Sequence, residues 1–188
     1  PRPGLVLRSR LIEQLNAGLH GRLTLVCAPA GFGKTTLVSG WLSGGDERGV
    51  MSDEWPDSAI HHSSLLVHEV PQRSGVDRFR IAWLSLDKGD NDPQRFLSYL
   101  VAALRQADGT LGENAWAMLQ SAQPPSFEQV LTSLINDLAM MTDRLLLVLD
   151  DYHVITAQAV HIALNFLVEH QPASLHLVIA VSYTHLRA

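Results

Sequence analysis

The sequence predicts an α/β fold built on a parallel β-sheet, and two features indicate it. Short apolar runs typical of buried strands alternate along the chain with amphipathic patterns typical of helices. Two of these runs end at residues suited to chemistry: one leads into a glycine-containing loop at 28–35, and another stops at Asp150 and Asp151. The chain has 188 residues, 46% of them apolar, which is enough for one domain with a buried core.

In the first part of the chain, we expect a helix, a strand and a second helix. Apolar residues at helical spacing before Gly21 predict a short amphipathic helix; they are Leu11, Ile12, Leu15 and Leu19. The apolar run 23–27 predicts a buried strand that feeds the loop, and residues 35–41 predict the helix after it.

Residues 43–79 interrupt this pattern. They are rich in Gly, Ser, His, Asp and Pro and have no sustained apolar period, which predicts a mobile insertion loop with one marginal strand at 65–67. His61, His62 and His68 lie in it. Because no cysteine partner or helical His pair accompanies them, we interpret these histidines as solvated residues and not as metal ligands.

Regular structure resumes with a strand at 81–86 that ends at Asp87. Asp92 and Pro93 then predict a helix N-cap and its first turn. After a loop with one short helical piece, Ser126 and Gln129 form a capping-box signature for a further helix. The run 145–149 predicts a strand covered on both faces, residues 157–169 a helix, and residues 175–181 the last strand.

Composition excludes several functional classes. The formal charge of -5 and the pI near 6.0 do not favour a nucleic-acid surface in this stretch. A single cysteine, Cys27, excludes an intrachain disulfide framework, and its place inside a predicted strand favours packing over chemistry. No apolar run is long enough to cross a bilayer and no signal peptide is recognisable, so we expect a cytoplasmic setting without membrane contact.

The loop at 28–35 has the features of a phosphate cradle, which needs inward-pointing backbone N–H groups and a helix N-terminus aimed at the anion. Gly31 and Gly33 give room for close approach, and Lys34, Thr35 and Thr36 begin the helix. Lys34 would contact the β- and γ-phosphates, while the Thr35 hydroxyl would bind Mg²⁺. Ala28 stands where the usual P-loop pattern has its first glycine.

Two carboxylates match this loop downstream. Asp150 follows an apolar strand, at the end where ligands of open α/β sheets gather, and is predicted to bind Mg²⁺ directly or through its water shell. Asp151 would then orient or deprotonate an attacking water, although a turn or helix-capping carboxylate is the alternative. Asp87 ends a strand at the same edge, where a solvated turn residue is favoured over a metal ligand.

Three segments carry a resemblance to a known family. They are the run from Leu23 to Leu37, the run from Ala82 to Pro93, and Leu147-Val148-Leu149-Asp150-Asp151-Tyr152-His153. In these the chain resembles the ATPase domain of the large MalT-like regulators of the LuxR family, a branch of the STAND signal-transduction ATPases. The resemblance implies a three-layer P-loop NTPase fold over residues 1–181, with Walker A at the loop and Walker B at Asp150. In that family an alanine at position 28 is normal.

Further site residues and partners follow from the resemblance. It implies that Ala30, Gly31, Phe32, Gly33, Lys34, Thr35 and Thr36 bind ATP or ADP with Mg²⁺, and that Val6 and Arg8 lie against the adenine. ADP would hold a resting state, whereas ATP and a small-molecule inducer would permit self-association and promoter binding. Slow ATP hydrolysis, with Lys34 and Asp151 as catalytic residues, would reset the switch. The DNA-binding helix-turn-helix and the helical sensor repeats of such regulators are absent from this sequence.

The end of the chain departs from the family pattern. The family strand matching 178–180 is normally followed by Ser-Arg, whose arginine can sense the γ-phosphate, but Val181-Ser182-Tyr183-Thr184 stands here. We therefore expect no sensor at this position and a tail, 182–188, that does not match the family. The sheet topology of this NTPase class implies that the last strand lies between the loop strand and the Asp150 strand, and that this sequence lacks one edge strand of the sheet. We expect this truncation to impair nucleotide-dependent switching and to spare nucleotide binding.

A metabolic NTP-dependent enzyme, such as a small P-loop kinase, is the alternative function. It would need an arginine-bearing lid over the nucleotide. No Arg or Lys occurs between Arg105 and Arg144, which disfavours a lid there. The 83–93 segment has no counterpart in a generic P-loop enzyme, and it therefore favours the regulator.

Overall fold

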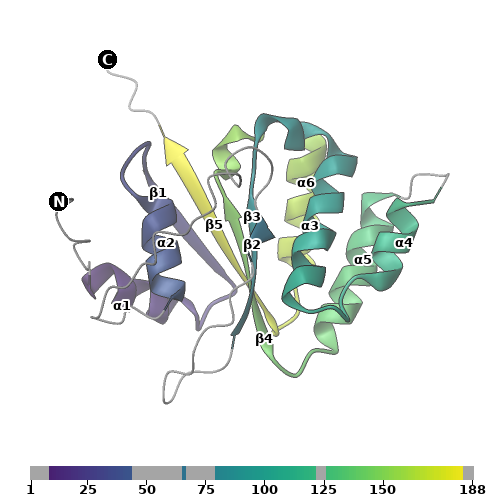
Figure 1. Cartoon of the computed structure of the whole chain (residues 1–188), viewed down its shortest axis with the longest axis horizontal. Helices are drawn as coiled ribbons and strands as arrows, with labels where there is room; N and C mark the ends of the chain where they lie inside the picture. The colour runs from purple at the N-terminus through teal and green to yellow at the C-terminus, as the bar shows by residue number, and fades with distance from the viewer. Residues whose placement is uncertain (1–8, 44–64, 67–78, 122–125, 184–188) are drawn as a thin grey trace.

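A five-stranded sheet forms the centre of the molecule (Figure 1). The computed structural model describes residues 9–43, 65–66, 79–121 and 126–183. The strands follow the order β1-β5-β4-β3-β2 across the sheet. Their bounds are β1 (Leu23–Pro29), β2 (Leu65–Leu66), β3 (Phe79–Ser85), β4 (Arg144–Asp150) and β5 (Leu175–Tyr183). Four strands are mutually parallel and β2 is antiparallel to β3, so the predicted α/β fold is confirmed.

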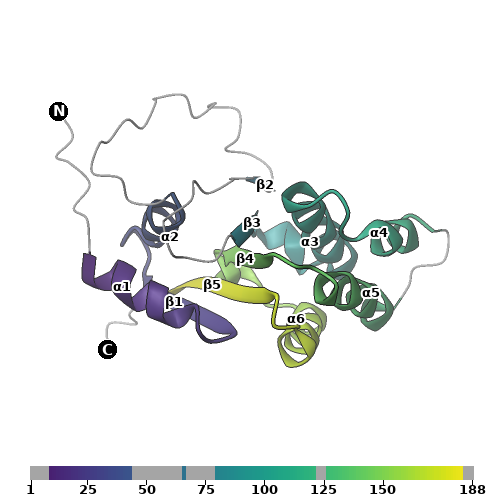
Figure 2. The same cartoon turned by 90° about the horizontal axis from the view of Figure 1, so that it is seen from below.

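Helices cover both faces of this sheet and make three layers (Figure 2). One face packs against α1 (Ser9–Gly18) and α2 (Lys34–Leu42) through a core centred on Trp83, Val148 and Trp41. The other packs against α3 (Pro93–Ala107), α5 (Phe127–Ala139) and α6 (Gln158–His170). Helix α4 (Glu113–Leu119) joins the same core by packing against α3 and α5. Alternate residues of β4 enter the two cores, as the pleat of a doubly covered strand requires.

Local sequence signals fix the helix starts. Asp92 caps α3 by accepting a hydrogen bond from the Arg95 N–H at 2.8 Å, and Pro93 occupies the first turn. Ser126 and Gln129 cap α5 reciprocally, as the capping-box signature predicts. Two short 3₁₀ helices, η2 (Lys88–Asn91) and η3 (Tyr152–Val154), lie where β3 and β4 end.

Strand β1 differs from its prediction as a buried strand. It lies at one edge of the described sheet, and its residues alternate between exposed and half-buried. Leu25 is 60% exposed and Leu23 43% exposed, because none of the described helices packs over this side of β1. Cys27 is also exposed, so the prediction that its side chain serves packing is wrong. The predicted position of β5 between β1 and β4 is confirmed.

Several predicted boundaries shift. Helix α1 ends at Gly18 and not at Gly21, while β5 continues to Tyr183, where Ser182 and Tyr183 pair with Ala28 and Pro29. Of the predicted insertion, residues 44–64 and 67–78 lie outside the described residues, as do its three histidines, and β2 pairs with Trp83 and Leu84. Among the described helices, none has the length and hydrophobicity needed to cross a membrane.

Candidate functional site

The loop after β1 is shaped by two glycines and ends at the start of α2. Gly31 and Gly33 have φ values of 80° and 72°, in the left-handed region that residues with a Cβ rarely adopt. Gly33 is the N-cap of α2 and has no side chain to satisfy the first N–H groups of the helix. The loop therefore presents unsatisfied backbone donors and the positive end of a helix dipole to one point.

Lys34 lies inside this loop, where only 7% of it is exposed. Its Nζ donates hydrogen bonds to the carbonyl oxygens of Ala28, at 3.2 Å, and Pro29, at 3.1 Å. These carbonyls belong to the end of β1, so the ammonium group is held over the concave side of the loop. A buried cation that donates its hydrogen bonds to backbone carbonyls is well placed to bind an anion.

Thr35 and Asp150 meet across the site although 115 positions separate them in the sequence. The Thr35 hydroxyl donates a hydrogen bond to Asp150 Oδ2 at 2.7 Å. Thr35 is positioned by the first turn of α2, and Asp150 by the last residue of β4. The parallel register of β1, β5 and β4 brings these two ends to the same edge of the sheet.

Asp150 is a buried carboxylate with only 2% of its surface exposed. Burial raises its pKa above the usual range, and the hydrogen bond from Thr35 opposes this effect. Its Oδ1 accepts a hydrogen bond from the Asp151 N–H at 2.9 Å. Both oxygens are thus held in fixed directions, which favours a defined role over a solvated turn residue.

Asp151 follows in an unusual backbone conformation. It has φ 56° and ψ 30°, and it is the one described residue other than glycine with a positive φ. Such a conformation costs about 1–2 kcal/mol and persists where the surrounding structure holds it. The carboxylate is half-exposed, and its Oδ1 lies 3.8 Å from His153 Nδ1. An acidic group beside the loop, open to solvent, can contact a water molecule.

The site has the donor set for a phosphate and a divalent cation. Backbone N–H groups, a helix N-terminus and Lys34 suit phosphate oxygens. The hydroxyl and carboxylate oxygens of Thr35 and Asp150 are the kind of ligand that Mg²⁺ prefers, and they are already adjacent. Over the described residues, no group of three or more His, Cys, Asp or Glu residues forms an all-protein metal cage.

The other predicted site residues are placed as follows. Ala30, Phe32 and Thr36 belong to the loop and the first turn of α2, and all three are exposed, Phe32 by 59%. Val6 and Arg8 lie outside the described residues. Asp87 does not join Asp150: its Oδ2 accepts from Arg95 at 2.9 Å, and its Oδ1 accepts from the Gly89 N–H at 2.6 Å.

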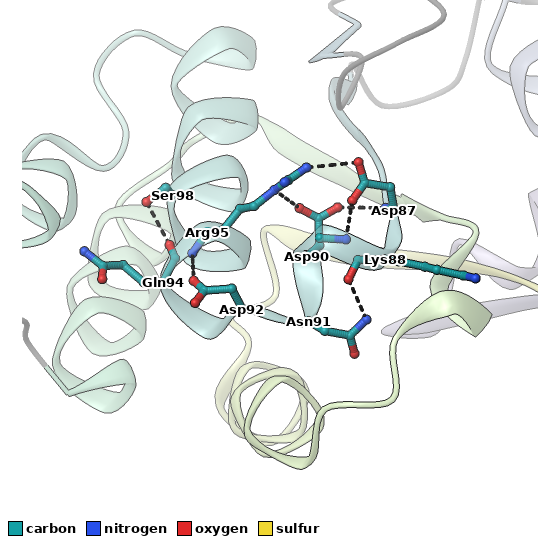
Figure 3. A network of polar contacts seen from close by, with 9 residues as sticks. Asp87, Lys88, Asp90, Asn91, Asp92, Gln94, Arg95 and Ser98 are labelled. Carbon is teal, nitrogen blue, oxygen red and sulfur yellow. Dashed lines mark hydrogen bonds and ion pairs between the residues drawn. The ribbon is translucent and has the colours of Figure 1, made fainter.

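A polar network that the sequence-based predictions did not include follows β3. Asp90 is fully buried, and it accepts hydrogen bonds from the Asp87 N–H at 2.8 Å and from Arg95 Nε at 3.1 Å. In Figure 3 the carboxylates of Asp87 and Asp90 both point toward the Arg95 guanidinium. The Asp-x-x-Asp spacing, which forms a capping box around η2, was the available signal.

The chain is similar to known proteins in fold and in sequence. No family model matches the chain. A Drosophila origin recognition complex structure, bound to AT-rich DNA and Cdc6, aligns with 93% of this chain and 46% of the matched chain, with a TM-score of 0.50 and 9% identity, and supports the fold alone. The HTH-type transcriptional regulator MalT of Cronobacter sakazakii (strain ATCC BAA-894) is 37% identical over 174 residues, which cover 93% of this chain and 16% of that protein. The chain is therefore similar to the HTH-type transcriptional regulator MalT over a segment that spans about a sixth of that protein.

Proposed function

We propose that this chain is the ATP-binding regulatory module of a MalT-like transcriptional regulator of the LuxR family. The observation that carries the proposal is the hydrogen bond of 2.7 Å between Thr35 and Asp150, which joins a phosphate-binding loop to an acidic strand end. A phosphate cradle and a Mg²⁺ ligand pair at one edge of a parallel sheet are what a Mg²⁺–nucleotide site requires. The similarity to MalT supports a regulatory role for that site.

Each residue has a separate role in this proposal. The N–H groups of 30–36 and the Lys34 ammonium bind the phosphates, with Lys34 leaving the two carbonyls of β1 for the β- and γ-phosphate oxygens. Thr35 and Asp150 hold Mg²⁺, which when bound neutralises charge on the phosphates. Asp151 orients the attacking water or accepts its proton. Val6 and Arg8 are proposed to lie against the adenine.

The wider role is that of a slow switch. ADP would favour a resting state and ATP an active state of the longer protein, which self-associates and binds DNA through parts outside this sequence. A small-molecule inducer would act through those parts as well, and the setting would be cytoplasmic, as for any regulator that binds promoters. The kinase alternative gains no support, because the stretch between Arg105 and Arg144 lacks basic residues for a lid.

The fate of the γ-phosphate tests this proposal. Parent chain, Asp151→Asn and Lys34→Ala are each mixed with γ-labelled ATP and Mg²⁺, with the protein in excess. We expect tight binding and slow release of inorganic phosphate by the parent, binding with a much slower but measurable release by Asp151→Asn, and weak binding by Lys34→Ala. Transfer of the label to an added small-molecule acceptor at a rate above hydrolysis would contradict the regulatory assignment.

A further inference from the structure

The connection between β4 and α6 carries Asp151, and it is anchored at both ends. On the near side, the Asp151 N–H donates to Asp150 Oδ1 at 2.9 Å, and the Val154 N–H donates to the Asp151 carbonyl at 3.0 Å. These two bonds close a tight turn around the left-handed backbone of Asp151. Since that conformation is unfavourable for a residue with a Cβ, the turn needs support from outside itself.

Asn91 supplies the support on the far side. Its Nδ2 donates to the Val154 carbonyl at 3.2 Å, and its Oδ1 accepts from the N–H groups of Thr156 and Ala157, both at 2.7 Å. Val154 is therefore bonded through its N–H to Asp151 and through its carbonyl to Asn91. A single residue, Val154, links the Asn91 amide to the Asp151 backbone.

Nothing in the local sequence of α6 replaces this contact. Ala157 is the N-cap of α6, and an alanine side chain accepts no hydrogen bond from the helix. The N–H of Ala157 itself would be taken by a side chain at the N3 position in a capping box, but Val160 stands there and has no acceptor. The Asn91 amide, 66 positions earlier in the sequence, accepts from this N–H. The start of α6 and the end of the Asp151 turn thus depend on one side chain from the β3 side of the sheet.

Asn91 is itself held in place. Its Nδ2 also donates to the Lys88 carbonyl at 3.0 Å across η2 (Figure 3). The buried Asp90 next to it is fixed by Arg95 from α3 and by the Asp87 N–H. Because Asn91 is bonded across η2 and the adjacent Asp90 is bonded to α3, the Asn91 amide is a rigid support and not a flexible surface group.

We propose that Asn91 is a positioning residue for ATP hydrolysis, which sets the direction of the Asp151 carboxylate by holding the turn that follows it. This inference rests on the proposed function, in which Asp151 orients the attacking water. Asn91 does not contact the loop at 28–35 through any of its hydrogen bonds, so phosphate and Mg²⁺ binding do not depend on it. Its loss therefore affects turnover more than nucleotide affinity.

The test compares affinity with single-turnover hydrolysis in the same proteins. We expect Asn91→Ala to bind Mg²⁺-ATP within about threefold of the parent, and to hydrolyse it at least tenfold more slowly. Asn91→Asp keeps an oxygen for the Thr156 and Ala157 N–H groups and is expected to recover part of the rate. Asn114→Ala, which alters an exposed asparagine on α4, is the matched control and should leave both quantities unchanged.

A double variant distinguishes positioning from general damage. When Asp151 is already replaced by Asn, adding Asn91→Ala should slow hydrolysis by less than twofold, because the group that Asn91 positions is gone. A full tenfold loss in the double variant would overturn the inference. So would a parent that binds ATP but hydrolyses it no faster than Asp151→Asn, although the nucleotide site would then stand. Should Asn91→Ala not fold, the same cycle with Asn91→Asp decides the matter.

Discussion

Replacing Asp150 by Asn is expected to abolish Mg²⁺-dependent nucleotide binding without destabilising the protein. Asp150 accepts one hydrogen bond from Thr35 and one from the Asp151 N–H. An asparagine can keep both contacts, since its oxygen accepts from Asp151 while its NH₂ group donates to the Thr35 hydroxyl, which can reverse its direction. The side chain volume is conserved, so no cavity forms.

The sign of the stability change follows from the pKa of Asp150. Burial raises this pKa, which means that the folded protein holds the proton more tightly than the unfolded chain does. The carboxylate charge at neutral pH therefore opposes folding, and its contribution becomes less favourable as pH rises through the raised pKa. We expect a free energy of unfolding between unchanged and about 2 kcal/mol higher for Asp150→Asn, measured without nucleotide.

Thermal unfolding with and without Mg²⁺-ATP measures both effects. For the parent, ATP at a hundred times its Kd adds about 2.7 kcal/mol, which raises Tm by roughly 5–11 °C. Asp150→Asn should start at an equal or higher Tm and show the same small shift with Mg²⁺ as with EDTA. A loss of more than about 2 kcal/mol in the ligand-free variant, or a full Mg²⁺-dependent shift, would refute the assignment of Asp150.

Three further predictions concern the fold around the site. His176 is fully buried between Thr24 and Gly21, and burial lowers its pKa below 6.5. The contribution of the neutral imidazole to the free energy of unfolding is therefore complete above pH 6.5 and is lost as pH falls, by up to about 1.4 kcal/mol per pH unit. The free energy of unfolding, measured with denaturant between pH 7.5 and 5, should therefore fall more steeply for the parent than for His176→Gln. Gly33→Ala should cost about 1–2 kcal/mol and weaken ATP binding, because its φ is 72°, whereas Gly40→Ala in open space within α2 should cost nothing. Asp90→Ala should lower the free energy of unfolding by about 2 kcal/mol, because the Asp87 N–H loses its acceptor, whereas the partly exposed Arg95 keeps its ion pair with Asp87. A free energy of unfolding for Asp90→Ala equal to that of the parent would contradict this prediction.

The sequence predicted those elements whose signals are local. The N-cap at Asp92, the capping box at Ser126 and the phosphate loop each depend on a few adjacent residues, and the structure has them in place. The pairing of Thr35 with Asp150 was predictable because parallel strands of this fold place their carboxyl ends at one edge. Site chemistry therefore emerged from short motifs combined with one topological rule.

Other features depend on contacts that no local pattern encodes. The apolar run of β1 predicts burial, but whether a strand is covered depends on which helices pack over it, and β1 lies at the edge of the described sheet. Asn91 lies in a polar turn after β3, and no local pattern singles it out, because its partners at 154–157 are more than 60 positions away in the sequence. Sequence reasoning identifies a polar turn, and only the tertiary structure reveals that its side chain supports another loop.

The central claim is that Lys34 lies in a nucleotide-binding loop, and a direct titration tests it. Calorimetric titration of ATP and ADP with Mg²⁺ into the parent and Lys34→Ala compares the two proteins, with Arg22→Ala as the control that removes one positive charge from the opposite end of β1. We predict that Arg22→Ala binds like the parent and that Lys34→Ala binds at least tenfold more weakly, in line with the loss of a charge-assisted contact. Equal affinity of the parent and Lys34→Ala for ATP would contradict the account.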